Sequence, residues 1–236
     1  AVLMRSAGCI VNDIIDRKFD KKVFRTKDRP IASEKISVKL GLIYATILCL
    51  LAFCVLINFN FFSILLALGS MPLAFTYPLM KRYTYWPQLF LGITFNYGLI
   101  LGWTSITNEI TLIPLIFYFG AIFWTLGYDT IYGFQDIKDD EIIGLKSTSI
   151  KFKNNPFYFL FLCYTIFSFS LIIIGIQMGF NKFYYIYLTI IFFQMFYLQL
   201  KNLEIKNANS CFNVFKSNNI LGALVLIGLI IGKVYS

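Results

Sequence analysis

The chain has 236 residues, of which 58% are hydrophobic and 14% charged, and its mean hydropathy is +0.71. One soluble core cannot bury so much apolar surface, so the composition excludes a soluble globular enzyme and favours a membrane protein. There is no His, and the five Cys form no CxxC pair. A histidine-ligated zinc site, a disulfide scaffold and a Ser–His or Cys–His triad are therefore disfavoured.

Seven apolar segments separated by polar loops follow one another along the chain. They contain no Lys, Arg, Asp or Glu apart from Asp129, and they cover residues 40–58, 61–80, 86–106, 112–133, 157–178, 183–200 and 220–231. A helix needs about 20 apolar residues to cross a bilayer, a length that all but the last segment approach. Residues 1–11 resemble the end of a further span, and without a starting Met we expect the chain to lack its native N-terminus.

These segments predict an all-α fold, a polytopic transmembrane helix bundle. We expect one transmembrane domain over residues 1–236, with about seven full spans and one truncated span at the N-terminus. The short polar connections between several segments indicate antiparallel neighbours. No part of the chain has the composition of a separate soluble domain or a long flexible linker.

Basic residues gather in alternate loops. All Lys and Arg except Lys182 and Lys233 fall in one set of loops, which covers 13–39 (with Arg5 counted here), 81–82, 134–156 and 201–219. If every segment crosses once, these loops share one side of the membrane, and the positive-inside tendency places that side in the cytoplasm. The net charge of +9 is thus a topology signal that also favours contact with anionic membrane lipid. Nucleic acid is not an expected partner, because the basic residues alternate with membrane spans.

The first motif with chemical meaning is NDIIDRKFD at residues 12–20. If the preceding span continues as a helix, Asn12, Asp16 and Asp20 recur every four residues and share one face. A single group of this kind is more often a set of solvated counter-charges at a membrane interface. Its functional interpretation therefore depends on a second group elsewhere in the chain.

A second acidic group, in the segment YDTIYGFQDIKDD at residues 128–140, supplies that support. Asp129, Asp136 and Asp140 are spaced by seven and four residues, again as one helical stripe. Asp129 lies within an apolar helix, where an ionised carboxylate is costly and marks a functional site. Both groups follow spans that run in the same direction, so we expect them to meet at one cavity mouth. Oxygen ligands of this kind suit Mg²⁺ that bridges carboxylates to phosphates.

Four segments of the chain resemble the UbiA superfamily of intramembrane prenyltransferases. NDIIDRKFD followed by FRTKDRP, and YDTIYGFQDIKDD followed by EIIGLKSTSI, resemble its two signature regions. YPLMKRYTYWPQ and CFNVFKSNNILG resemble the branch that prenylates 4-hydroxybenzoate in ubiquinone biosynthesis. The resemblance runs from Arg5 to the C-terminus. It implies nine transmembrane helices, of which the first and part of the second would precede this chain.

The resemblance also implies roles for individual residues. The ligands of Mg²⁺ and its diphosphate would be Asn12, Asp16, Asp20, Asp136 and Asp140, supported by Asp13, Asp129 and Asp139. The catalytic candidates are Asp16, Asp20, Asp129, Asp136 and Asp140. The basic residues expected near the diphosphate are Arg5, Arg29, Lys81 and Lys146. Arg82 would engage the carboxylate of the aromatic acceptor. Tyr85 stands where many relatives carry His, so no imidazole is expected near that acceptor.

Aromatic side chains next to the motifs are candidates for the wall of the reaction chamber. An allylic cation is stabilised over aromatic faces and protected when water is excluded. The candidates are Tyr77, Tyr128, Tyr132 and Phe134, of which Tyr132 is the predicted substrate contact. Most of the other aromatic residues have an ordinary interpretation as lipid-facing or interfacial packing.

The predicted function is Mg²⁺-dependent transfer of a polyprenyl group from its diphosphate to the ring carbon ortho to the hydroxyl of 4-hydroxybenzoate. The expected location is a bacterial inner membrane, with the mitochondrial inner membrane as the alternative, and the active site faces the cytoplasm. One alternative is a relative with another acceptor: homogentisate, a naphthoate, a haem or glycerol phosphate. A divalent-cation transporter or a structural membrane subunit are alternatives from other classes. The hydropathy excludes a soluble prenyl synthase.

Overall fold

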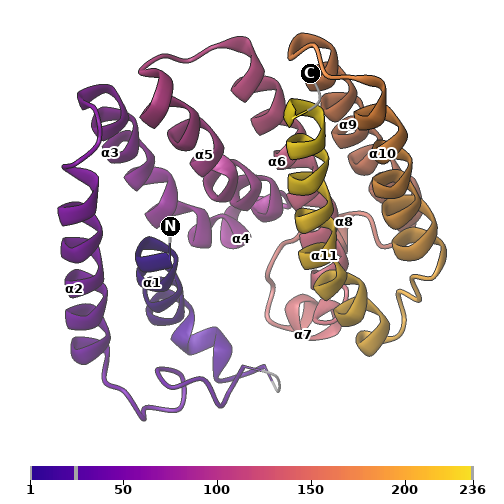
Figure 1. The fold of residues 1–236 in the computed structure, drawn as a ribbon. Helices are drawn as coiled ribbons and strands as arrows, with labels where there is room; N and C mark the ends of the chain where they lie inside the picture. The colour runs from indigo at the N-terminus through magenta and orange to yellow at the C-terminus, as the bar shows by residue number, and fades with distance from the viewer. Residues whose placement is uncertain (1, 24–25, 235–236) are drawn as a thin grey trace.

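The computed structural model describes residues 2–23 and 26–234, and every regular element within these ranges is helical. The long helices are α1 (Val2–Asp20), α2 (Val38–Leu56), α3 (Phe61–Thr76), α5 (Pro87–Thr107), α6 (Leu112–Gly133), α9 (Pro156–Gln177), α10 (Lys182–Phe192) and α11 (Ala208–Val234). The short ones are η1 (Tyr77–Leu79), α4 (Met80–Tyr83), α7 (Ile137–Ile142), α8 (Thr148–Lys151) and the π-helix η2 (Phe193–Lys201). The predicted all-α fold is confirmed (Figure 1).

Seven helical segments are long and apolar enough to cross a membrane, as predicted. They cover Val38–Leu56, Phe61–Tyr83, Pro87–Thr107, Leu112–Gly133, Pro156–Gln177, Lys182–Lys201 and Ala208–Val234. The last segment was predicted over 220–231 only. It begins earlier because Cys211, Val214 and Asn218 continue the buried face of the helix through a polar stretch. Before these spans, α1 extends the predicted 1–11 segment to Asp20, with Ala1 outside the described residues.

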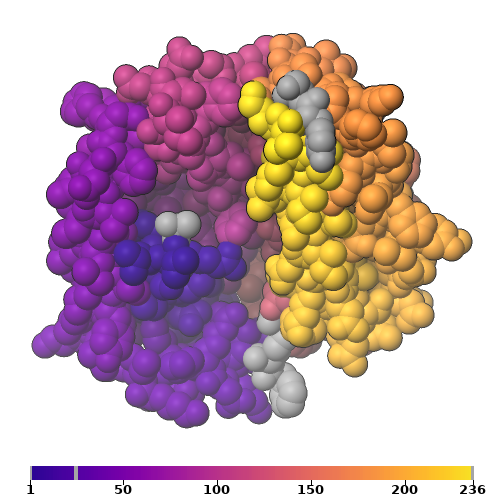
Figure 2. All heavy atoms as spheres, viewed as in Figure 1, coloured from indigo at the N-terminus to yellow at the C-terminus, as the bar shows by residue number. Residues whose placement is uncertain are grey.

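The helices form a curved bundle (Figure 1). α1 packs against α2, α5 against α6, α6 against α9, and α11 against both α6 and α10. The main core lies among α6, α9, η2 and α11, where Tyr164, Phe167 and Leu160 are fully buried. On α2 only Gly41 and Ala45 are buried, which leaves an apolar outer surface suited to lipid. The space-filling view is hollowed between α1 and α11 (Figure 2).

The close approach of α6 and α9 requires glycine on α6. A Cβ atom built on Gly120 would lie 1.8 Å from Ser170 Oγ and 2.5 Å from Ser170 Cβ. One built on Gly127 would lie 2.8 Å from Cε1 of Tyr164. Small residues let transmembrane helices pack backbone to backbone, and this contact holds α6 in place above the candidate site described below.

Gly120→Ala is expected to lower the free energy of unfolding by about 1–3 kcal/mol, because the added methyl group overpacks the α6–α9 contact. Gly69→Ala is the matched control, since a Cβ on that α3 residue meets no atom within 4 Å. This substitution is expected to be neutral or stabilising by up to about 1 kcal/mol. Thermal unfolding of both variants in detergent measures the difference. Equal unfolding temperatures for the two variants would refute the close packing.

Candidate functional site

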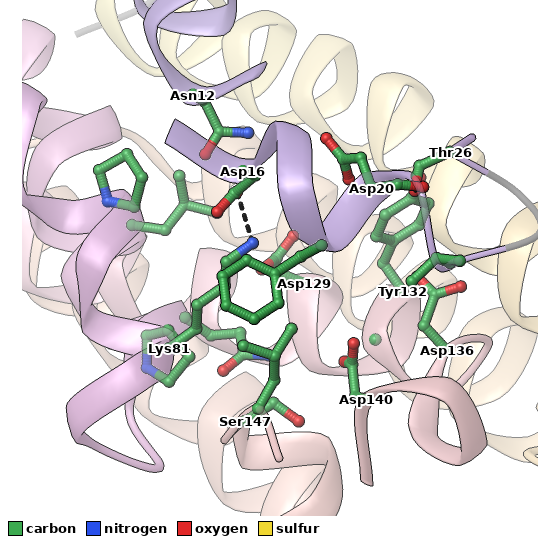
Figure 3. A pocket seen from close by; sticks show the side chains of 18 of the residues that line it. Asn12, Asp16, Asp20, Thr26, Lys81, Asp129, Tyr132, Asp136, Asp140 and Ser147 are labelled. Atoms are coloured by element: carbon green, nitrogen blue, oxygen red, sulfur yellow. Dashed lines mark hydrogen bonds and ion pairs between the residues drawn. The ribbon is translucent and has the colours of Figure 1, made fainter. Parts of the chain in front are cut away.

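A cavity of about 280 Å³ opens where α1 and α6 end (Figure 3). Its walls come from the C-terminal half of α1, the loop after it, the η1–α4 segment, the start of α5, the end of α6 and residues 136–147. The polar lining includes the predicted ligands Asn12, Asp16, Asp20, Asp136 and Asp140, together with Asp129. Two acidic groups that are far apart in the sequence thus line one cavity. We call this end of the bundle the motif end.

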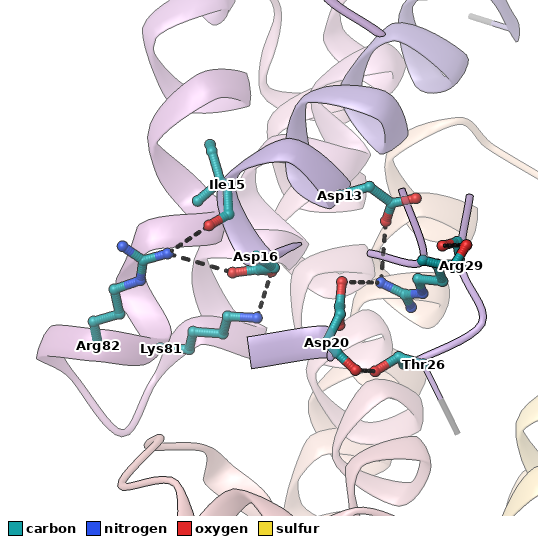
Figure 4. A network of polar contacts seen from close by, with 9 residues as sticks. Asp13, Ile15, Asp16, Asp20, Thr26, Arg29, Lys81 and Arg82 are labelled. Carbon is teal, nitrogen blue, oxygen red and sulfur yellow. Dashed lines mark hydrogen bonds and ion pairs between the residues drawn. The ribbon is translucent and has the colours of Figure 1, made fainter. Parts of the chain in front are cut away.

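Asp16 is the most deeply buried carboxylate of the first group. α1 is continuous from Val2 to Asp20, so Asn12, Asp16 and Asp20 share one face. Lys81 Nζ lies 2.5 Å from Asp16 Oδ2, and Arg82 Nη2 lies 3.6 Å from Asp16 Oδ1 (Figure 4). Asp16 is 1% exposed, and its Oδ1 accepts no hydrogen bond from any described residue. A buried charge of this kind is stable only when paired, so the two cations hold α4 against α1.

The loop after α1 folds back on the helix through Arg29. Its Nη1 donates to Asp13 Oδ1 at 3.1 Å and to Asp20 Oδ2 at 3.2 Å (Figure 4). Thr26 Oγ1 donates to the backbone carbonyl of Asp20 at 3.2 Å. Burial raises the pKa of the Asp13 carboxyl above its ordinary value, and the Arg29 guanidinium opposes this rise. These bonds place a guanidinium between carboxylates at the cavity wall.

The second acidic group is not one helical stripe, so that expectation was wrong. α6 ends at Gly133, and a turn separates it from α7. The backbone tightens in this turn. The N–H groups of Phe134, Gln135 and Asp136 each donate to the carbonyl oxygen three residues earlier, at 3.2–3.3 Å. A Cβ on Gly133 would lie 2.4 Å from Ser149 Oγ, so the chain passes close to the 147–151 segment. Asp129, Asp136 and Asp140 still line the cavity, from two helices and the turn between them.

The predicted basic and aromatic residues divide into two sets. Those that line the cavity are Arg29, Lys81, Lys146, Tyr77 and Tyr132. Two cations lie outside the lining: the Arg5 guanidinium stands 5.0 Å from the ring centre of Phe95, and that of Arg82 stands 5.0 Å from the ring centre of Phe19. The lining also leaves out Asp13, Tyr128, Phe134 and Asp139. The roles assigned to all these residues stay predictions.

The polar wall residues that were not singled out from the sequence are Thr26, Gln88 and Ser147. Gln88 is buried, and its Oε1 accepts a hydrogen bond from the backbone N–H of Thr148 at 3.0 Å. Ser147 lines the cavity and caps α8 by accepting from the Ile150 N–H. Behind it, the hydroxyls of Thr130 and Thr148 lie 2.6 Å apart. The available signal was the run KSTS at residues 146–149, because buried hydroxyls require partners.

The donor set fits a divalent cation that is shared with a ligand. All the acidic groups offer oxygen, which Mg²⁺ prefers, and Asp16 Oδ1 is a buried oxygen without a donor among the described residues. No three His, Cys, Asp or Glu of the described residues lie close enough to hold an ion by themselves. A cation here would need further oxygens from water or a substrate phosphate. That requirement is typical of Mg²⁺, which usually binds through one or two carboxylates and substrate phosphates.

Comparison with known proteins gives consistent matches. Residues 1–235 match the profile of the UbiA prenyltransferase family. The chain is 42% identical over 238 residues to human mitochondrial 4-hydroxybenzoate polyprenyltransferase, covering 100% of this chain and 63% of that protein. It is 39% identical over 232 residues to the 4-hydroxybenzoate octaprenyltransferase of Francisella tularensis subsp. novicida, covering 98% of this chain and 81% of that protein. The chain thus spans less than two thirds of the mitochondrial relative.

Two solved structures share the fold. A UbiA homolog from Aeropyrum pernix K1, solved in its apo form, superposes with a TM-score of 0.83 at 21% identity, covering 97% of this chain and 86% of that one. A structure described as a digeranylgeranylglyceryl phosphate synthase superposes with a TM-score of 0.70, also at 21% identity, covering 98% and 81%. At this identity the likeness supports the helical architecture alone.

Proposed function

This chain belongs to the UbiA prenyltransferase family, and from that premise we propose that it transfers a polyprenyl group from a polyprenyl diphosphate to 4-hydroxybenzoate. The bond forms at the ring carbon ortho to the hydroxyl, a step of ubiquinone biosynthesis. One observation carries the proposal: both acidic groups line one cavity with Arg29, Lys81 and Lys146. Carboxylates beside cations suit a metal-bound diphosphate.

The acidic residues would bind the diphosphate through Mg²⁺, held by Asn12, Asp16, Asp20, Asp136 and Asp140. A bound divalent cation would neutralise charge on the diphosphate as the allylic C–O bond breaks. Lys81, Lys146 and Arg29 would stabilise the negative charge that accumulates on the leaving group. Because Lys81 already pairs with Asp16 at 2.5 Å, ligand binding would move its ammonium from the carboxylate toward a phosphate oxygen.

Carbon–carbon bond formation would follow loss of the diphosphate. The ring carbon of the acceptor attacks the allylic carbon, and the ring proton passes to Asp129, to diphosphate or to water. Tyr132 lines the cavity, and its ring centre lies 4.4 Å from that of Phe215. Its ring would form part of the wall beside the allylic cation. Arg82 would engage the acceptor carboxylate only after leaving the Ile15 carbonyl, to which it donates at 3.0 Å.

We place the protein in an inner membrane, bacterial or mitochondrial, with the motif end toward the cytoplasm or the corresponding matrix side. The basic residues gathered in the loops at that end support this orientation. The prenyl tail would extend between the helices into the lipid, and the hollow between α1 and α11 is a route for it (Figure 2).

An assay of the purified protein in liposomes tests the proposal. With Mg²⁺, 4-hydroxybenzoate and prenyl diphosphates of graded length, we expect a product with the mass of the prenylated acid. Chelation of divalent cations should abolish it, and added Mg²⁺ should restore it. Parallel reactions with homogentisate and a naphthoate identify the acceptor. Uptake of radiolabelled Mg²⁺ without any prenylated product would instead indicate the transporter.

A further inference from the structure

The segment CFNVFKSNNILG at residues 211–222 has no part in the chemistry proposed above. It lies in α11, and of the described residues that line the cavity at the motif end, none belongs to α9, η2 or α11. Yet α11 packs against α6, the helix that carries Asp129 and Tyr132 to the cavity. Any effect of this segment on the site therefore has to pass through α6.

Phe215 links α11 to the wall of the cavity. Its ring centre lies 4.4 Å from that of Tyr132, with 38° between the two ring planes. The ring of Tyr128 lies 5.8 Å from the Phe215 ring, at 60° to it. Aromatic rings at such distances are in direct contact and prefer tilted or offset arrangements. The Phe215 ring thus limits the orientations that are open to the Tyr132 ring.

The same row of rings continues into the core of the bundle. Trp124 lies one turn before Tyr128 on α6, and the two ring centres are 5.7 Å apart at 76°. Trp124 also stacks on Phe167 of α9, at 5.1 Å and 11°, and Phe167 is fully buried. A continuous series of ring contacts therefore connects the wall of the cavity to closely packed parts of α6 and α9.

A buried amide fixes α11 next to this row. Asn218, one turn after Phe215, accepts a hydrogen bond at Oδ1 from Trp124 Nε1 at 2.8 Å and from Gln199 Nε2 at 3.4 Å. Its Nδ2 donates to the carbonyl oxygens of Val214 and Phe215 at 3.1 and 3.2 Å. Polar side chains bonded across transmembrane helices fix the helices relative to one another. The bond to Trp124 thereby keeps the Phe215 side of α11 toward α6.

We propose that Phe215 is a positioning residue, which holds the Tyr132 ring in the orientation needed beside the reacting prenyl group. This role rests on the proposed function. A ring stabilises an allylic cation only where its face is presented to the charge, and a small misplacement can cost up to about 100-fold in rate. The residues proposed to bind the diphosphate come from α1, α4, α7 and the loops beside them, so binding of that substrate does not depend on Phe215.

Steady-state kinetics of Phe215→Leu test the proposal, because Leu fills apolar space without a flat ring. We expect kcat for prenyl transfer to fall about 10- to 100-fold while KM for the prenyl diphosphate stays unchanged. Phe215→Tyr retains the ring and should retain kcat. Phe212→Leu is the matched control, since Phe212 lies on the same helix outside the cavity lining, with Lys216 Nζ 4.3 Å from its ring centre. Its kcat should equal that of the unsubstituted protein.

A double substitution shows whether Phe215 acts through Tyr132. Tyr132→Leu is itself expected to lower kcat, and adding Phe215→Leu to it should lower kcat no further, because residues in contact are not additive. Additive losses, an unchanged kcat in Phe215→Leu, or an equal loss in Phe212→Leu overturns the proposal. Thermal unfolding in detergent verifies that the variants are folded. Phe215→Met, which also lacks a ring, replaces Phe215→Leu if that variant folds poorly.

Fluorine NMR of a fluorotyrosine in place of Tyr132 gives a readout that does not require the reaction. The signal is expected to be broad in the otherwise unsubstituted protein and to narrow in Phe215→Leu, because the ring then moves faster. An unchanged line width overturns the positioning role. Absence of prenylated product from the unsubstituted protein would instead refute the proposed function, and the fluorine signal would still decide whether Phe215 restrains the Tyr132 ring.

Discussion

Asp16→Asn and Asp136→Asn are each expected to lower the rate of prenyl transfer by at least about 10²-fold, the effect of losing one electrostatic contact to a charged transition state. The two residues come from different acidic groups but line the same cavity. Each substitution keeps the shape of the side chain and removes its charge, so cation and diphosphate lose one ligand. The rate is measured over a range of Mg²⁺ concentrations, because a weakened ligand set is partly restored by mass action.

Asp28→Asn is the control for these variants. Asp28 is exposed in the loop after α1 and does not line the cavity, so its substitution should leave the rate unchanged. Elution volume and thermal unfolding in detergent verify that all three variants remain folded. If Asp16→Asn or Asp136→Asn transferred the prenyl group at the normal rate at every Mg²⁺ concentration, that residue would not be a ligand.

Lys81→Gln is expected to lower the free energy of unfolding by up to about 3–5 kcal/mol, because it leaves a buried carboxylate with a weaker partner. The Asp16 side chain is 2% exposed, and Arg82 Nη2, at 3.6 Å, would be its remaining cation. Adding Asp16→Asn to Lys81→Gln removes the unpaired charge. The double variant should therefore be more stable than Lys81→Gln alone.

A double-mutant cycle by thermal or denaturant unfolding measures this coupling, since contacting residues deviate from additivity by roughly 0.5–3 kcal/mol. Lys153→Gln is the control. Lys153 pairs with Glu141 at 2.5 Å on the surface, where an ion pair contributes about 0–1 kcal/mol. Additive effects of Asp16→Asn and Lys81→Gln would contradict a stabilising contact between the two side chains.

The architecture was predictable because a bilayer imposes a simple length rule. Each apolar segment must cross as a helix, so hydropathy alone located all seven spans. The helical spacing of Asn12, Asp16 and Asp20 was equally readable, because α1 runs without interruption to Asp20. The start of α11 could not be predicted from hydropathy. Its buried face continues through a stretch with Asn and Lys residues, which lower the local mean hydropathy.

The break at Gly133 and the π-helix η2 depend on tertiary contacts that the local sequence does not express. In η2 the buried residues come in pairs five apart, Gln194 with Gln199 and Met195 with Leu200. Hydrogen bonds that close every five residues bring such pairs to one face. There the Gln199 Oε1 accepts from the Tyr164 hydroxyl at 2.7 Å. The hydrogen bond between Gln199 and the distant Tyr164 thus stabilises a π-helix that an α-helical sequence pattern does not predict.

The positions of the basic residues were only partly predictable. Family resemblance pointed to Arg5 and Arg82, but neither lines the cavity, and both guanidinium groups lie over phenylalanine rings. A long cationic side chain can contact any carboxylate, carbonyl group or aromatic face within its reach. Which of these it contacts depends on how α4 and α5 pack against α1.

Electron paramagnetic resonance of Mn²⁺ in place of Mg²⁺, with an unreactive prenyl thiodiphosphate, tests most directly whether the two acidic groups hold one cation–diphosphate complex. We expect a bound Mn²⁺ signal coupled to phosphorus nuclei in the unsubstituted protein. That signal should be lost in Asp16→Asn and also in Asp136→Asn. A phosphorus-coupled signal of unchanged intensity after Asp136 and Asp140 are both replaced by Asn would contradict a shared site.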